Sequence, residues 1–187
     1  MHLCTMMVKD IDNVTTIQYK TKGDLIYQIG PTYEDIASSQ YLVNIHGVDE
    51  SPAPIFDLEQ EFLVHKKVQN LIKKEIISSA HDISEGGLFV TLMESAMLSN
   101  LGFDITTDSS IRNDAYLFGE SQSRIIISVS PDNEDELIDL MMTKDVEFHL
   151  VGHVTKGAIR IDDQDWGDVN FFKDLYDNAL GDILDKY

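Results

Sequence analysis

The chain has 187 residues, of which 33 are Asp or Glu and 14 are Lys or Arg, so its formal net charge is −19. Its 43% hydrophobic residues are typical of a globular protein of one domain, which excludes a disordered acidic tail. The excess of acid excludes nucleic acid and anionic membranes as primary partners, because both need a basic surface.

The cysteine count and the lengths of the apolar runs exclude further classes of protein. The single cysteine, Cys4, which we expect in a strand, excludes an internal disulfide and a multi-cysteine zinc site, and agrees with a reducing cytoplasm. No apolar run approaches the roughly 20 residues that span a bilayer, and no segment has the pattern of a targeting signal.

The first third of the chain predicts two strands and a short helix. Residues 14–20 are β-branched and alternating, and residues 24–29 repeat this character after a turn at Gly23. Residues 38–46 are expected to form a short helix capped by one of its first two serines. The proline-rich stretch 51–54 is a rigid connector.

Two helices are predicted next. Asp57 is a good N-cap for a long helix, with acids in its first turn and lysines at its far end. Helical spacing predicts one buried face on this helix, made of Leu58, Phe62, Val64, Val68, Leu71 and Ile72. Residues 86–98 predict a second helix that has little polar surface, so we expect it to be central.

Strands and helices alternate through residues 103–129. A strand at 103–106, a short helix at 111–118 and a strong strand at 124–129 are expected. An amphipathic helix follows Pro131, with Leu137, Ile138, Leu140 and Met141 on its buried side.

The chain is expected to close with two strands and a helix. Residues 148–154 and 158–161 read as a closing pair of strands, and residues 170–184 as a final helix. This helix offers Phe171, Leu175, Leu180 and Ile183 for packing. The predicted fold class is α/β, an α+β sandwich in which one mixed sheet is packed with helices, as a single domain over residues 1–187.

The segment 81–88 is the first candidate site. Gly86 and Gly87 stand at the start of the apolar helix, where free amide groups and the helix dipole suit a phosphate, together with His81, Asp82 or Ser84. Residues 75–111 contain no Lys or Arg, so a phosphate bound here depends on such groups or on a metal. The alternative is structural: Asp82 and Glu85 have the spacing of a capping box, and two glycines permit tight helix packing.

The segment 117–124 is the second candidate. Glu120, Ser121 and Gln122 form a polar turn before a strand and can present side chains to a cleft, and Arg124 can pair with a phosphate or with Glu120. The alternative is a solvated turn with a local Glu–Arg pair.

The remaining polar residues predict no catalytic or metal site. His46, His65, His149 and His153 show no ligand spacing, and no catalytic Ser–His–Asp or Cys–His arrangement is present. The eight Asp residues between 162 and 187 lack the spacing of a calcium loop and are expected to form a solvated face.

These motifs together resemble phosphoribosylformylglycinamidine synthase. The sequence His-Asp-Ile-Ser-Glu-Gly-Gly-Leu at 81–88, Glu-Ser-Ala at 94–96, residues 117–124 and Gly-His-Val at 152–154 carry the resemblance. It extends over about residues 14–187 and is greatest to the last copy of the aminoimidazole ribonucleotide synthetase-like C-terminal domain in the large synthetase subunit. Residues 1–13 would then be the connection from a preceding domain.

The resemblance implies a carbon–nitrogen ligase of purine biosynthesis in the cytoplasm. It implies ATP and Mg²⁺ as cofactors, formylglycinamide ribonucleotide as substrate, and as partners a glutaminase and the other domains of the synthetase. In this reading Glu120, Ser121 and Gln122 match a tripeptide that contacts the ribonucleotide, while Gly86 and Gly87 match a turn that faces phosphate. The family's catalytic histidine and main metal-binding acids lie in other domains, so the chain alone is expected to be inactive.

Two other functions stay open on the sequence alone. The chain can be a non-catalytic module that binds a structural nucleotide or docks neighbouring domains. It can also belong to a related ATP-dependent enzyme such as aminoimidazole ribonucleotide synthetase or selenophosphate synthetase.

Overall fold

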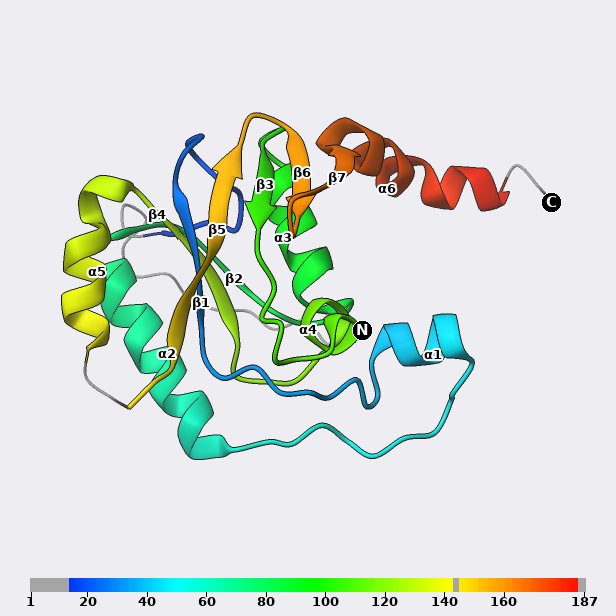
Figure 1. Cartoon of the computed structure of the whole chain (residues 1–187), viewed down its shortest axis with the longest axis horizontal. Helices are drawn as coiled ribbons and strands as arrows, with labels where there is room; N and C mark the ends of the chain where they lie inside the picture. The colour runs from blue at the N-terminus through cyan, green and yellow to red at the C-terminus, as the bar shows by residue number, and fades with distance from the viewer. Residues whose placement is uncertain (1–13, 143–144, 185–187) are drawn as a thin grey trace.

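The computed structural model describes residues 14–142 and 145–184, which form a seven-stranded sheet covered by helices (Figure 1). The strands lie in the order β2-β4-β1-β5-β3-β6-β7, and β3 and β6 are parallel while the other neighbours are antiparallel. The sheet is therefore mixed, as predicted. The strands are β1 (Leu25–Ile29), β2 (Ile77–Asp82), β3 (Gly102–Ile105), β4 (Ile125–Val129), β5 (Phe148–Thr155), β6 (Ala158–Ile161) and β7 (Gln164–Asp168). The helices are α1 (Gln40–His46), α2 (Leu58–Lys73), α3 (Gly87–Met97), α4 (Asn113–Phe118), the 3-10 turn η2 (Pro131–Asn133), α5 (Glu134–Met141) and α6 (Val169–Leu184).

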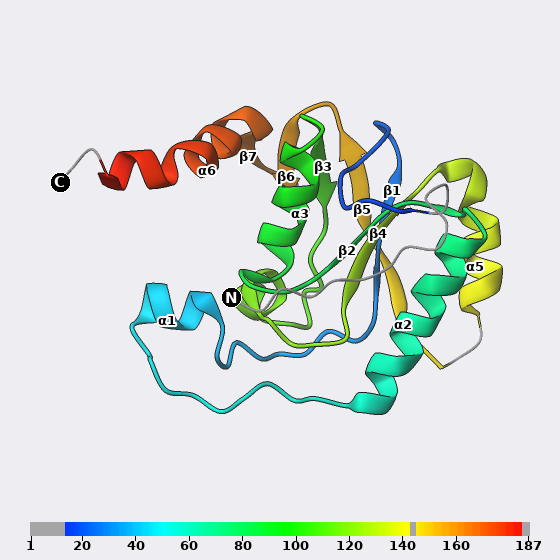
Figure 2. The same cartoon turned by 180° about the vertical axis from the view of Figure 1, so that it is seen from behind.

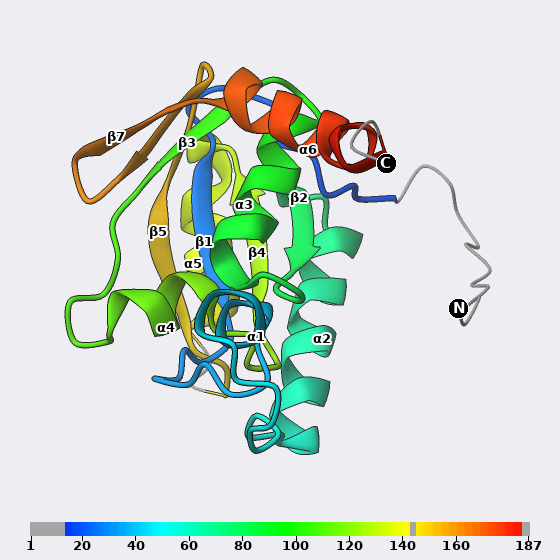
Figure 3. The same cartoon turned by 90° about the vertical axis from the view of Figure 1, so that its right-hand side faces the viewer.

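Each face of the sheet has its own apolar core. On one face α3 and α4 pack through residues such as Leu88, Leu92 and Tyr116. On the other face α2 and α5 pack through residues such as Val64 and Leu137. Figure 2 and Figure 3 show the sheet standing between these two helical layers.

The predicted first strand does not form. Residues 14–20 run without strand structure, although Tyr19 is fully buried and its amide donates to the Ser95 carbonyl. The strand expected after the turn at Gly23, β1, already pairs with β4 along one edge and with β5 along the other. No edge of β1 is left to pair with residues 14–20, so this segment packs on the core instead. The strand that we expected around Cys4 and the connection at 1–13 lie outside the described residues.

The two closing strands form at the predicted places but are not neighbours. β3 lies between β5 and β6 and pairs with both. A further strand that the sequence did not predict, β7, pairs with β6 at the end of the sheet and is exposed along its whole length. Alternating burial is the signal that reveals a strand, and an exposed edge strand lacks it.

Both predicted N-caps are confirmed. The Ser39 side chain accepts from the Leu42 amide at the start of α1, and the Asp57 carboxylate accepts from the Glu59 and Gln60 amides at the start of α2. The buried face of α2 is shorter than predicted: Val64, Val68 and Leu71 are buried, but Leu58 and Phe62 are 71% and 63% exposed. The first six residues of α2 contribute no buried side chain, so the core contact of this helix begins at Val64.

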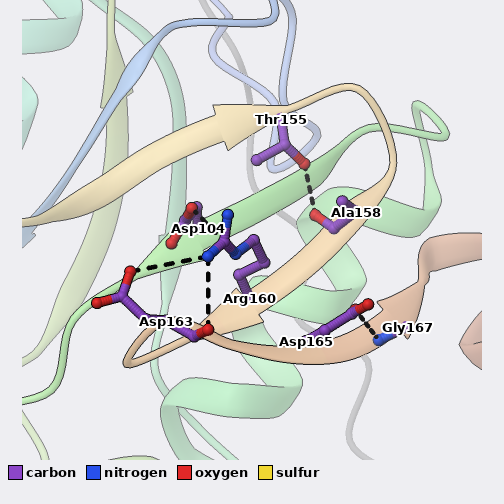
Figure 4. A network of polar contacts seen from close by, with 7 residues as sticks. All are labelled: Asp104, Thr155, Ala158, Arg160, Asp163, Asp165 and Gly167. Carbon is purple, nitrogen blue, oxygen red and sulfur yellow. Dashed lines mark hydrogen bonds and ion pairs between the residues drawn. The ribbon is translucent and has the colours of Figure 1, made fainter.

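Several aspartates after β6 stabilise turns (Figure 4). The Arg160 guanidinium lies 3.7 Å from carboxylate oxygens of both Asp104 and Asp163, and Asp165 accepts from the Gly167 amide at 2.9 Å. Asp168 in turn accepts from the Asn170 amide at 2.9 Å in the first turn of α6. This acidic run therefore shapes the β6–β7 hairpin and the start of the last helix.

The last helix is only partly covered. Phe171, Leu175, Leu180 and Ile183, which were expected to be available for packing, are each more than half exposed. Among the described residues no helix is both long and apolar enough to cross a bilayer.

Candidate functional site

A cleft of about 870 Å³ brings the two candidate segments together. It lies between α2, the end of β2 with the loop before α3, and the turn before β4. Its lining includes five of the predicted site residues, namely His81, Asp82, Ser84, Glu120 and Gln122. Segments separated by about 35 residues in the sequence thus share one cleft because β2 and β4 are paired neighbours in the sheet.

The glycine pair allows the start of α3 to approach α4 closely. Gly86 and Gly87 have φ values of 86° and 69°, which favour glycine. A Cβ on Gly87 would lie 2.7 Å from backbone atoms of Phe118, and a Cβ on Gly86 would lie 2.4 Å from the Val90 side chain. The tight packing that the alternative interpretation predicted is therefore present.

The amide groups of both glycines donate within the chain. Gly87 N donates to the Ser84 carbonyl at 3.0 Å, and Gly86 N donates to Glu120 Oε1 at 2.9 Å. A carboxylate of the protein itself therefore takes the anion position at the start of α3, where the helix dipole favours negative charge. A ligand phosphate reaching the Gly86 amide would have to displace Glu120.

Glu120 joins two helix N-termini. The same Oε1 atom also accepts from the amide of Gln40, the first residue of α1, at 2.7 Å. The capping-box interpretation of Asp82 and Glu85 is wrong, since the N-cap of α3 is Gly86 and no side chain caps it locally. The carboxylate comes instead from a residue 34 positions away in the chain.

Arg124 holds the backbone of the turn at residues 119–122. The residue is 2% exposed, and its Nε and Nη2 atoms donate to the carbonyls of Ser121 at 3.1 Å and Gly119 at 2.5 Å. Burial lowers the pKa of this guanidinium to about 10, so it stays charged at neutral pH. The expected pairing of Arg124 with Glu120 is not formed. The turn is also not a solvated one, because Ser121 and Arg124 are buried, whereas Gln122 is exposed at the cleft.

His81 faces the central helix as well as the cleft. Its Nδ1 lies 3.1 Å from Ser95 Oγ and its Nε2 lies 3.4 Å from a Glu94 carboxylate oxygen, both on α3. Both ring nitrogens therefore have partners in the chain. Asp82 and Ser84 are exposed and line the cleft.

The opposite wall comes from α2, which no sequence motif connects with the site. Glu61 accepts from Ser123 Oγ at 2.5 Å and lies 2.9 Å from His65 Nε2, and both Glu61 and His65 line the cleft. No local signal marks Glu61, because its role depends on how α2 packs against β4.

The cleft is acidic. Its lining has four carboxylates, from Glu61, Asp82, Glu85 and Glu120, and its one Lys or Arg among the described residues is Arg124. No group of three or more His, Cys, Asp and Glu side chains that could hold a metal ion occurs in the described part of the chain. Side chains here suit hydroxyl and amine groups of a ligand better than a phosphate.

Comparison with known proteins identifies several relatives. The model of the family described as AIR synthase related protein, C-terminal domain, matches residues 21–163. The phosphoribosylformylglycinamidine synthase subunit PurL of Moorella thermoacetica is 38% identical over 146 residues, which cover 78% of this chain and 20% of that protein. PurL of Methanobrevibacter smithii is 31% identical over 188 residues, covering 96% of this chain and 25% of that protein. The chain thus spans about a fifth to a quarter of these relatives' length.

Solved structures share the fold. PurL of Thermotoga maritima complexed with FGAR superposes with a TM-score of 0.74 at 15% identity, covering 87% of this chain and 30% of that chain. A thiamine-monophosphate kinase from Stenotrophomonas maltophilia gives a TM-score of 0.55 at 20% identity and covers 80% of this chain and 53% of that chain.

Proposed function

Since the chain belongs to the family of AIR synthase related C-terminal domains, we propose that it is one domain of a phosphoribosylformylglycinamidine synthase. The proposed reaction of the complete enzyme is the ATP- and glutamine-dependent amidation of formylglycinamide ribonucleotide in purine biosynthesis. It is a carbon–nitrogen ligase reaction, and we place it in the cytoplasm. The observation that carries the proposal is the shared cleft, which Glu120 and Gln122 line together with Asp82 and Ser84.

The chemistry of the cleft supports a contribution to substrate binding. Carboxylates of Asp82 and Glu120 can accept hydrogen bonds from ribose hydroxyls, and the Gln122 amide can both donate and accept. His81, Gly86, Gly87 and Ser121 support this surface through contacts within the chain. None of these groups supplies the positive charge that the phosphates of ATP and of the ribonucleotide require.

The missing charge supports an incomplete site. Mg²⁺ and basic groups from another domain of the synthetase would provide it, so the isolated chain is inactive in this proposal. Relatives of the fold have been solved as PurL complexed with ATP and as PurLQS from Thermotoga maritima. The first name supports ATP as the nucleotide of the complete enzyme, and the second supports an assembly with other subunits. We propose Mg²⁺ as the second cofactor, because it would offset the phosphate charge, and a glutaminase as the partner that supplies ammonia.

The test compares the isolated chain with the complete synthetase that carries it. Product formation from ATP, Mg²⁺, ammonia and formylglycinamide ribonucleotide is expected only for the complete enzyme. In that enzyme Gln122→Ala is expected to raise the KM for the ribonucleotide by about tenfold, the value of one or two lost hydrogen bonds. Exposed Gln164→Ala, at the far edge of the sheet, is the control. An isolated chain that turns over at an enzyme-like rate would refute the incomplete site.

A second candidate is a non-catalytic module that binds a nucleotide or only docks other domains. It is favoured by the internal hydrogen bonds of Gly86, Gly87 and Glu120, which leave these groups already paired. Calorimetry with ADP and Mg²⁺ separates the two: binding only in the complete enzyme supports a shared cleft, and no binding in either supports docking alone.

A further inference from the structure

Ser123, near the end of the polar turn before β4, has a backbone conformation that is unusual for its residue type. Its φ is 64°, in the left-handed region that a residue with a Cβ rarely adopts. The residue is 8% exposed and lines the cleft. Such a conformation persists only where the surrounding structure holds it, and it is found most often at functional sites. We therefore ask which contacts hold Ser123 and what they serve.

The backbone of Ser123 is fixed by the end of β1. A Cβ added to Gly30, whose φ is 102°, would overlap the Ser123 carbonyl, so the two backbones touch at this point. Gly30 N in turn donates to the Glu147 carbonyl at 2.8 Å, which attaches it to the segment before β5. This close approach, which only a glycine permits, restricts the movement of the Ser123 backbone.

The side chain of Ser123 is fixed by α2. Its Oγ donates to Glu61 Oε2 at 2.5 Å, although the two residues are 62 positions apart in the chain. The other carboxylate oxygen, Oε1, lies 2.9 Å from His65 Nε2, one turn further along the helix. Both oxygens of Glu61 thus have partners within the chain, and the Ser123–Glu61 latch, as we call this hydrogen bond, joins α2 to the turn.

Gln122 lies between two fixed neighbours. On one side, Ser121 is 2% exposed and its carbonyl accepts from Arg124 Nε at 3.1 Å. On the other side, Ser123 is held by the latch. Gln122 itself is exposed and lines the cleft. A binding side chain contributes most when its neighbours fix its position in advance, because less conformational freedom is then lost on binding.

We propose that the Ser123–Glu61 latch positions Gln122 for the ribonucleotide. The inference rests on the proposed function, which gives Gln122 its ligand. Ser123 and Glu61 are positioning residues in it, because they act through the direction of the Gln122 side chain. Without the latch the strained turn relaxes, and the Gln122 amide meets the ligand in a smaller fraction of the molecules, so the apparent affinity falls by that fraction.

Hydrogen exchange tests the latch independently of the reaction. Amide exchange of residues 119–125 is measured by mass spectrometry in the complete synthetase without substrate. Glu61→Ala is expected to speed exchange in this segment by about tenfold, because the turn opens more often without its contact to α2. Glu61→Gln keeps an acceptor oxygen for Ser123 and should restore most of the protection. Glu59→Ala, which changes an exposed glutamate of the same helical turn outside the cleft, is the control and should leave exchange unchanged.

Kinetics with the ribonucleotide show whether the latch acts through Gln122. Glu61→Ala is expected to raise the KM for the ribonucleotide by about fivefold, less than Gln122→Ala, because a misplaced amide still makes part of its contacts. In a Gln122→Ala background the same substitution should add nothing, since the side chain that the latch positions is gone. A merely structural role of Glu61 would make the two effects additive, and that result would overturn the inference.

Two further results separate the latch from the proposed function. If Gln122→Ala raises the KM while Glu61→Ala changes neither the exchange of residues 119–125 nor the KM, the latch is refuted and the proposed function stands. If Glu61→Ala speeds exchange but Gln122→Ala leaves the KM unchanged, Gln122 does not bind the ribonucleotide. The proposed role of the cleft then fails, and the latch remains a contact that only holds the turn.

Discussion

Replacing Glu120 tests the link between the two helix N-termini. Its Oε1 accepts from Gly86 N at 2.9 Å and from Gln40 N at 2.7 Å. A hydrogen bond to a charged acceptor contributes about 1.5–3 kcal/mol, and one to a neutral acceptor about 0.5–1.5 kcal/mol. Glu120→Gln keeps an acceptor oxygen but removes the charge, so both hydrogen bonds become neutral ones. The free energy of unfolding should fall by about 2 kcal/mol, and solvent screening of this half-exposed group makes the loss smaller.

Glu120→Ala removes the acceptor altogether. Two amides then lose their partner, and the expected cost rises to about 2–4 kcal/mol. Urea unfolding followed by circular dichroism measures both variants, and Glu85→Gln, an exposed glutamate of the same cleft, is the control with an expected change within about 0.5 kcal/mol. Amide chemical shifts of Gly86 and Gln40 should both move in Glu120→Gln. If Glu120→Gln and Glu85→Gln unfold alike and neither amide shifts, the carboxylate does not hold the two helices.

Three further substitutions test other features of the fold. Gly87→Ala should lower the free energy of unfolding by about 2–4 kcal/mol in the same urea assay, because it combines a positive φ with a Cβ clash. Gly181→Ala is the control: its Cβ meets open space in α6, so it should raise the free energy of unfolding by up to about 1 kcal/mol. Burial raises the pKa of the Asp24 carboxyl, so the folded state holds its proton longer than the unfolded state, and stability should fall as pH rises from about 4 through that raised pKa. Asp24→Asn should abolish this decline and stabilise the protein at pH 7, and an unchanged pH profile would contradict the assignment. Arg124→Lys loses the forked contact with two carbonyls and should cost about 2–3 kcal/mol, and a thermal midpoint equal to that of the parent protein would show that the fork is dispensable.

Local signals predicted the helices well. The caps at Ser39 and Asp57 depend on hydrogen bonds within two or three residues, so the sequence pattern is sufficient to locate them. The apolar run 86–98 likewise predicted a central helix, and α3 occupies that place.

Strand partners could not be predicted in the same way. Residues 14–20 have strand propensity, but whether they pair depends on which edges of β1 are free, and β4 and β5 take both. β3 separates β5 from β6 for a similar reason, since parallel pairing of β3 with β6 joins segments more than 50 residues apart. Propensity describes a segment, whereas pairing is decided by competition among segments.

The candidate site was likewise predictable only where its signals are local. Both motifs were found from their residues, but the partner of the Gly86 amide comes from 34 residues away, and Glu61 joins the cleft only through the packing of α2. Residue types indicated an anion site at the glycine pair. The fold places a carboxylate there, which no spacing rule within 81–88 could reveal.

The acidity of the cleft decides how a phosphorylated ligand could bind there. The cleft carries four carboxylates, and its one guanidinium is engaged by the carbonyls of the Glu120 turn. Close carboxylates in a partly buried cleft raise the cost of bringing a phosphate near, because like charges repel and solvent screening is reduced. A phosphorylated ligand therefore becomes favourable here only when a cation or a basic surface arrives with it. In the proposed function another domain of the synthetase brings that basic surface to the edge of the cleft, so domain docking and ligand binding are coupled through the same charge.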